Sequence, residues 1–135
     1  MNMKTNVMAM LLSALGMMML AGVWHEVIML KFYAKETGAS HEGTAIIFLS
    51  YLILSFLMVV LYNQRKSYAQ KLRDGIYFGA LMGVLWVFPH ELAMAGAHGE
   101  SLSYVLINGV WHVVEQALGG FIIAFIFSRD KMSYA

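Results

Sequence analysis

The feature that most constrains this chain is a set of four apolar stretches, at about residues 7–30, 44–62, 75–95 and 104–128. A helix needs about 20 mostly apolar residues to cross the roughly 30 Å hydrocarbon core of a bilayer. Apolar residues make up 60% of the chain and charged residues only 13%, unlike a soluble domain. The sequence therefore predicts an all-α fold, a four-transmembrane-helix bundle in the lipid bilayer, formed by residues 1–135 as a single integral membrane domain.

The basic residues predict the orientation of this bundle. Seven of the nine lysines and arginines lie near the N-terminus, between the second and third stretches, or in the C-terminal tail, whereas Lys31 and Lys35 lie on the other side. Because basic residues concentrate in cytoplasmic loops, we expect both termini to be cytoplasmic. The net charge of +1 gives no support for a nucleic-acid partner. The absence of cysteine excludes a disulfide or a thiolate metal site.

The histidines and glutamates of this chain occur together. Each of the five histidines is followed within one to three residues by a glutamate, and these pairs contain five of the six glutamates. Ionisable residues within membrane spans are costly and mark functional sites by default. The pairs are His25-Glu26, His41-Glu42, His90-Glu91, His98 with Glu100, and His112 with Glu115.

Three of these pairs lie at a similar predicted depth. His25 and His90 each precede the outward end of a span by five residues, and His112 lies eight residues into the last span. At about 1.5 Å per residue, all three lie within about 7–12 Å of the outer hydrocarbon boundary. In the last span, Asn108, His112 and Glu115 also share one helical face. We therefore expect a polar site in the outer half of the bundle.

A local repeat suggests how the helices are organised. Residues 25–29 and 90–94 share the pattern His-Glu-apolar-apolar-Met, and a short polar segment with another His/Glu pair follows each of them. This predicts two helical hairpins related as an internal duplication. Membrane proteins built from such repeats often place the functional site between the halves.

A transition metal is the sharpest functional hypothesis for this site. Imidazole and carboxylate ligands without cysteine suit iron, manganese, zinc or copper(II). The protein would bind such a metal for redox chemistry or metal handling, and whether it is an enzyme stays open. We expect Asn108 and Ser55 to support the ligands, and His41, Glu42, His98 and Glu100 to form an outer entrance. The candidate metal ligands are His25, Glu26, His90, Glu91, His112 and Glu115.

Several alternatives compete with the metal site. The same residues can form a metal-free polar network, or a His/Glu relay for protons or ions. Haem held between His25 and His90 is less favoured, because a glutamate adjoins each of these histidines. The chain can also be an accessory structural subunit of a larger membrane complex, and a transport function would favour a homo-oligomer.

Two segments resemble a known family. Residues 104–112, Tyr-Val-Leu-Ile-Asn-Gly-Val-Trp-His, with the apolar run that follows, resemble the last helix of small bacterial four-helix membrane proteins of unknown function. The segment Ala21-Gly22-Val23-Trp24 resembles the early Gly-x-x-Trp region of their first helix, with one residue fewer between glycine and tryptophan. The resemblance implies a four-helix fold in the bacterial inner membrane and no particular activity. The His-Glu pairs at 25–26 and 90–91 are not part of that family pattern.

Overall fold

Four long helices account for most of the chain, in the number and order that the sequence predicts. The computed structural model describes residues 2–29, 31, 41–65, 72–99 and 101–132, without the side chains of residues 41, 42 and 130–132. No strand occurs within these ranges, and all four helices are long and apolar enough to span a membrane. The helices are α1 (Met3–Val23), which continues into the π-helical η1 (Trp24–Ile28), α2 (His41–Gln64), α3 (Leu72–His98) and α4 (Leu102–Met132). The chain is therefore a multi-pass membrane protein, and the predicted fold class is confirmed.

Local signals explain where the helices begin and end. The side chain of Asn2 accepts a hydrogen bond from the Lys4 backbone N–H at 3.1 Å, which caps the start of α1. Ser101 caps α4 in the same way, through a 3.2 Å bond from the Tyr104 N–H. Helix α3 ends at Gly99, whose φ of 72° favours glycine.

Glycines bring α3 and α4 into backbone contact. Gly75, Gly79 and Gly83 recur at four-residue intervals and are buried on one face of α3. A Cβ atom added at Gly79 would overlap the backbone carbonyl of Gln116, and one at Gly83 would lie 2.7 Å from the Cα of Val113. Small residues at this spacing let membrane helices approach closely. This contact fixes α4 against α3 as a hairpin.

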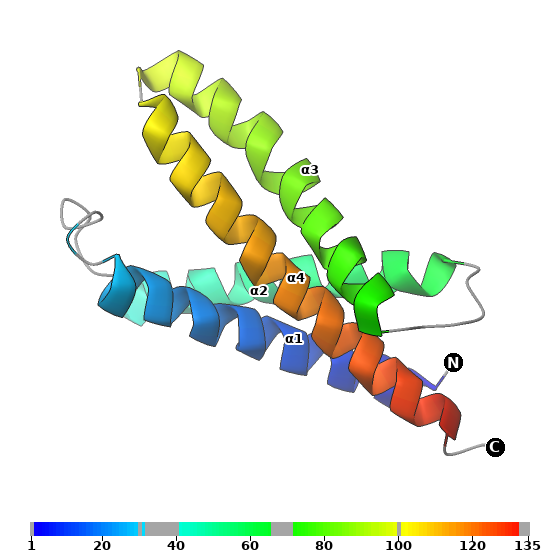
Figure 1. Cartoon of the computed structure of the whole chain (residues 1–135). Coiled ribbons are helices and arrows are strands. Elements are labelled where there is room, and N and C mark those ends of the chain that lie inside the picture. The colour runs from blue at the N-terminus through cyan, green and yellow to red at the C-terminus, as the bar shows by residue number, and fades with distance from the viewer. Residues whose placement is uncertain (1, 30, 32–40, 66–71, 100, 133–135) are drawn as a thin grey trace.

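The four helices converge at the end of the molecule that holds both termini (Figure 1). There the Asn63 side chain of α2 donates a 3.2 Å hydrogen bond to Asn6 of α1. The Tyr62 ring packs against Phe78 of α3 and Phe127 of α4, with centroid distances of 5.2 and 5.8 Å. Most of the buried apolar side chains belong to one cluster that includes these three rings. The hydrophobic core is therefore concentrated near this end.

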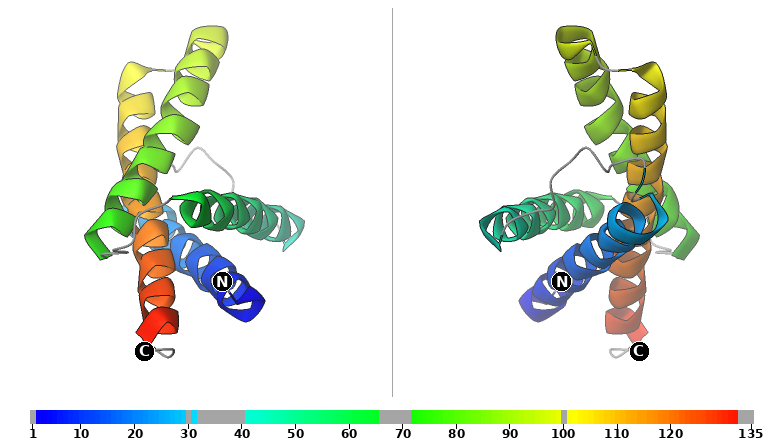
Figure 2. Two further views of the ribbon diagram at one scale, coloured as in Figure 1. Left: turned by 90° about the vertical axis from the view of Figure 1, so that its right-hand side faces the viewer. Right: turned by 90° about the vertical axis from the view of Figure 1, so that its left-hand side faces the viewer.

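Toward the opposite end the two hairpins separate. In Figures 1 and 2, the α3–α4 hairpin projects away from α1 and α2, so that the hairpins form a V rather than a bundle of nearly parallel helices. Many large apolar side chains are consequently exposed, as lipid-facing side chains are in a membrane protein. This divergence determines which polar residues can meet.

Candidate functional site

The centre of the candidate site is the carboxyl group of Glu115 on α4. Glu115 is fully buried, at 0% exposure, and so is its neighbour Gln116. Within the described part of the chain, neither carboxyl oxygen of Glu115 and neither polar atom of the Gln116 amide has a hydrogen-bond partner. Buried polar groups are nearly always hydrogen-bonded. The polar atoms of these two side chains are therefore available to bind a further group inside the membrane-spanning segment.

His112 is the partner of Glu115 on the same helix. Its Nδ1 atom lies 3.7 Å from a Glu115 carboxyl oxygen. This distance exceeds that of a hydrogen bond and lies within the range of an ion pair, which forms when the imidazole carries a proton. The i, i+3 spacing places both side chains on one helical face, as the sequence predicts. The His112 side chain is 23% exposed, so it links the buried carboxyl group to the surface of the site.

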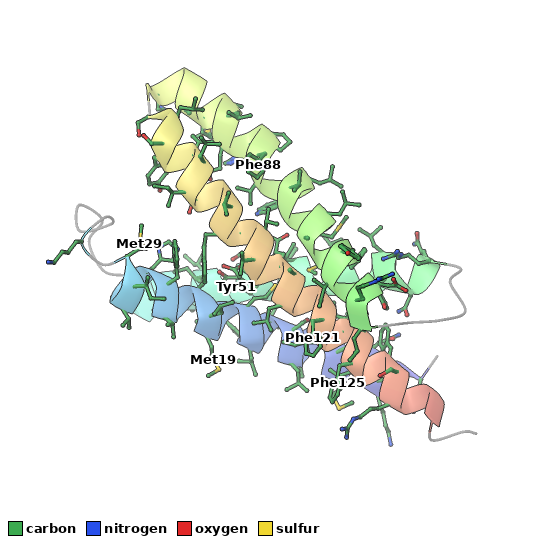
Figure 3. The ribbon with its side chains drawn as sticks, in the orientation of Figure 1. Met19, Met29, Tyr51, Phe88, Phe121 and Phe125 are labelled. Carbon is green, nitrogen blue, oxygen red and sulfur yellow. The ribbon has the colours of Figure 1, made fainter. Side chains whose placement is uncertain are left out.

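Helix α2 contributes Tyr51, labelled in Figure 3, which lies beside the Glu115 carboxyl group. The tyrosine is buried, and its hydroxyl lies close enough to Glu115 to interact with the carboxyl group. One turn further along α2, the fully buried Ser55 has a hydroxyl without a hydrogen-bond partner among the described residues. The polar centre is therefore formed by two helices that belong to different hairpins.

The side chains of Tyr51, His112, Glu115 and Gln116 line a pocket of about 320 Å³ between the two hairpins. Aliphatic side chains of α2 form much of its wall, and Trp86 of α3 adds an aromatic ring. Ligand pockets are commonly apolar with a few polar groups that fix the orientation of the ligand. The lining residues are Ile47, Ser50, Tyr51, Ile53, Leu54, Leu57, Trp86, His112, Glu115 and Gln116.

The π-helical segment η1 reaches α4 next to this pocket. Its Trp24 ring stacks on that of Trp111, and neither indole N–H has a hydrogen-bond partner in the ranges described above. The π-helical turn is closed by a 2.8 Å hydrogen bond from the Met29 N–H to the Trp24 carbonyl. Single π-helical turns are frequent at functional sites. Here the turn brings the segment that carries His25 close to α4.

The six predicted metal ligands do not come together as one group. His112 and Glu115 are adjacent, but Glu26 and His90 are exposed, and His25 and Glu91 are only partly buried. Among the described residues, no three side chains of His, Asp or Glu lie close enough to hold one metal ion. The expectation of a common site assumed nearly parallel helices. The V-shaped arrangement instead separates the C-terminal part of α3, to which His90 and Glu91 belong, from η1 (Figure 1).

The predicted supporting and entrance residues have mixed positions. Asn108 is buried one turn before His112, and Ser55 is buried one turn beyond Tyr51. His98 is exposed at the end of α3. The side chains of His41 and Glu42, at the start of α2, and the whole of Glu100 lie outside the described residues.

Sequence reasoning missed two residues of the pocket, Gln116 and Trp86. Gln116 adjoins Glu115 and is an amide within an apolar span, which is a signal that the His-Glu pattern obscured. Trp86 lies within the third span, but no sequence signal places its ring opposite α2. Its position depends on how α3 is rotated against α4.

The fold and the site together define a class: a multi-pass α-helical membrane protein with a buried polar pocket between two hairpins. Comparisons of the chain with protein-family models, curated proteins and solved structures find no match. The resemblance of the last helix to small bacterial membrane proteins therefore stays an interpretation of the sequence.

Proposed function

We propose that this protein binds a proton reversibly at Glu115 within the membrane, and that this site serves the transport of a solute or ion. The observation that carries the proposal is the complete burial of a carboxyl group without a hydrogen-bond partner in the described part of the chain. An isolated carboxylate in an apolar environment is costly, so the group is stable only when it carries a proton or pairs with a cation. A carboxyl group in this environment is therefore suited to exchanging a bound proton for a bound cation.

His112 supports the proposal as the neighbouring proton acceptor. Its Nδ1 faces the Glu115 carboxyl group at 3.7 Å, and its side chain reaches the pocket. An imidazole ring can accept a proton at one nitrogen and donate one from the other, so His112 can pass protons between the carboxyl group and water that enters the pocket. The pair would thus connect the buried carboxyl group with the pocket opening.

Proton flux in liposomes tests this function. The purified protein is reconstituted with a pH-sensitive dye inside the vesicles, and a potassium gradient with valinomycin supplies the driving force. We expect dye acidification with the wild-type protein and its loss with Glu115→Gln. Glu26→Gln is the matched control, because Glu26 is exposed on η1 and does not line the pocket. Equal flux from all three proteins, or no flux above empty vesicles, would contradict the proposal.

A transition metal is the second candidate, and the His112–Glu115 pair favours it. An imidazole nitrogen and a carboxyl oxygen 3.7 Å apart provide two ligands suited to iron, zinc, manganese or copper(II). The other coordination positions of the metal would be filled by a partner protein, a bound small molecule or water. Elemental analysis of protein purified without added metal tests this candidate. Stoichiometric metal that is lost with His112→Ala supports it, and wild-type protein without metal counts against it.

The cellular setting is also a proposal. We place the protein in the bacterial inner membrane, with both termini cytoplasmic, because the basic residues are concentrated on the side of the termini. Both termini lie at the same end of the molecule (Figure 1), as this topology requires. The many large apolar side chains exposed along all four helices are compatible with lipid, a second copy of the chain or a larger membrane complex. Stable co-purifying proteins would favour an accessory role.

A further inference from the structure

We infer that the pocket between α2 and α4 binds a small lipophilic organic cation, whose positive charge pairs with the carboxylate of Glu115. This inference rests on the proposed transport function of the Glu115 site and names the class of solute that the site binds.

The charges of the pocket select a cation. Its described lining contains one carboxyl group and no lysine or arginine. The titratable groups that face Glu115 are His112 from its own helix and Tyr51 from α2. An anionic ligand would meet the carboxylate without a fixed positive charge nearby, which is unfavourable in a low-dielectric environment. A cation supplies the positive charge that no lysine or arginine of the described lining gives the Glu115 carboxylate.

The remaining walls require that the ligand be apolar apart from its charge. Ile47, Ile53, Leu54 and Leu57 provide aliphatic surface from α2. A hydrated inorganic ion would lose its water against these side chains without replacement, whereas an organic cation would bury carbon against them. The pocket therefore matches a ligand with a charged head and a hydrocarbon body.

Aromatic rings strengthen the preference for a quaternary or alkylated ammonium group. Trp86 and Tyr51 line the pocket from α3 and α2, with the carboxyl group of Glu115 between the hairpins. The face of an aromatic ring attracts a cation, and tryptophan does so most strongly. Such rings are a common means of recognising ammonium groups that cannot donate several hydrogen bonds.

The volume limits the size of the ligand. About 320 Å³ is near the lower end of the roughly 300–1,000 Å³ range of small-molecule pockets. A single aromatic ring with a trimethylammonium group is a reasonable probe for this space. Ile53 of α2 and Trp86 of α3 line the pocket and are exposed, so a lipophilic cation can reach it from the surface of the molecule.

A matched pair of probes separates charge from shape. Benzyltrimethylammonium carries the positive charge, and neopentylbenzene has the same shape with carbon in place of nitrogen. We measure binding of tritiated benzyltrimethylammonium to the full-length protein in detergent by scintillation proximity, with unlabelled competitors. We expect saturable binding that unlabelled cation displaces and that neopentylbenzene and benzenesulfonate do not. Displacement by neopentylbenzene at equal concentration would overturn the inference, because it would mean that the pocket recognises only shape.

Two variants locate the binding site. Glu115→Gln should weaken binding about tenfold or more, since it removes the charge partner. Trp86→Ala should weaken it roughly two- to fivefold through the lost ring contact. Trp86 is 62% exposed, so this variant keeps the fold and provides a test even where Glu115→Gln is poorly stable. The control Glu26→Gln should bind like wild type. Unchanged affinity in Trp86→Ala and Glu115→Gln would overturn the inference.

The result is distinguishable from a failure of the proposed function. If proton flux depends on Glu115 but the organic cation shows no saturable binding, the proposed proton site is supported and this class of ligand is rejected.

Discussion

The indole rings of Trp24 and Trp111 stack almost in parallel, with centroids 4.1 Å apart and planes inclined by 4°. Trp24 begins the π-helical segment of the first hairpin, and Trp111 precedes His112 on α4. The stack therefore joins the two hairpins, at the residue that precedes His112 of the candidate site. Its contribution to stability is open to a direct test.

Trp24→Ala should destabilise the protein by about 1 kcal/mol or more, because it removes a stacked aromatic pair and its buried area. The measurement is the thermal midpoint in detergent, followed by size-exclusion chromatography after heating. Trp86→Ala is the control, since Trp86 is 62% exposed and its loss should change the midpoint little. Equal midpoints for the two variants would show that the stack contributes nothing.

Gly79→Ala should destabilise the α3–α4 hairpin by about 1–3 kcal/mol, because the added methyl group would overlap the Gln116 carbonyl and force the helices apart. Gly96→Ala on the same helix is the matched control. A Cβ atom there meets nothing within 4 Å, and alanine has the better helix propensity. Chemical unfolding in detergent compares the two. A Gly79→Ala protein as stable as Gly96→Ala would contradict the glycine contact.

Glu115→Gln should leave stability unchanged or raise it, since it keeps the side-chain shape and removes an ionisable group that no hydrogen bond satisfies among the described residues. The measurement is the unfolding midpoint at neutral pH. Glu26→Gln, at an exposed position, should stay within about 0.5 kcal/mol of wild type. A marked loss of stability confined to Glu115→Gln would mean that the carboxyl group has a structural role instead.

The topology can be tested without background labelling because the chain contains no cysteine. Single cysteines replace Gln64, at the end of α2, and Ser101, before α4. A membrane-impermeant maleimide added to intact spheroplasts should label Ser101→Cys and not Gln64→Cys, and permeabilised cells should label both. The reverse pattern would contradict the cytoplasmic placement of both termini.

Local patterns in the sequence predicted the parts of this structure that depend on a single helix. The four spans follow from the length and apolar character of each stretch. The adjacency of His112 and Glu115 follows from their i, i+3 spacing on α4. The close approach of α3 to α4 follows from its glycine stripe.

The parts that depend on angles between helices could not be predicted in the same way. A shared depth for His25, His90 and His112 assumes nearly parallel spans, whereas the hairpins form a V. Tyr51 reaches Glu115 only because α2 is rotated toward α4, and sequence spacing does not determine this rotation. The pocket therefore depends on how the two hairpins are arranged, and the His-Glu pattern predicted only the wall that α4 contributes.

Reversible proton binding at Glu115 can be observed by infrared difference spectroscopy of the carboxyl C=O stretch during a pH titration, since this method detects protonated carboxyl groups. We expect a titrating carboxyl band from the wild-type protein that is absent from Glu115→Gln and retained in Glu26→Gln. A spectrum that is identical in the wild type and Glu115→Gln across the titration would contradict reversible proton binding at Glu115.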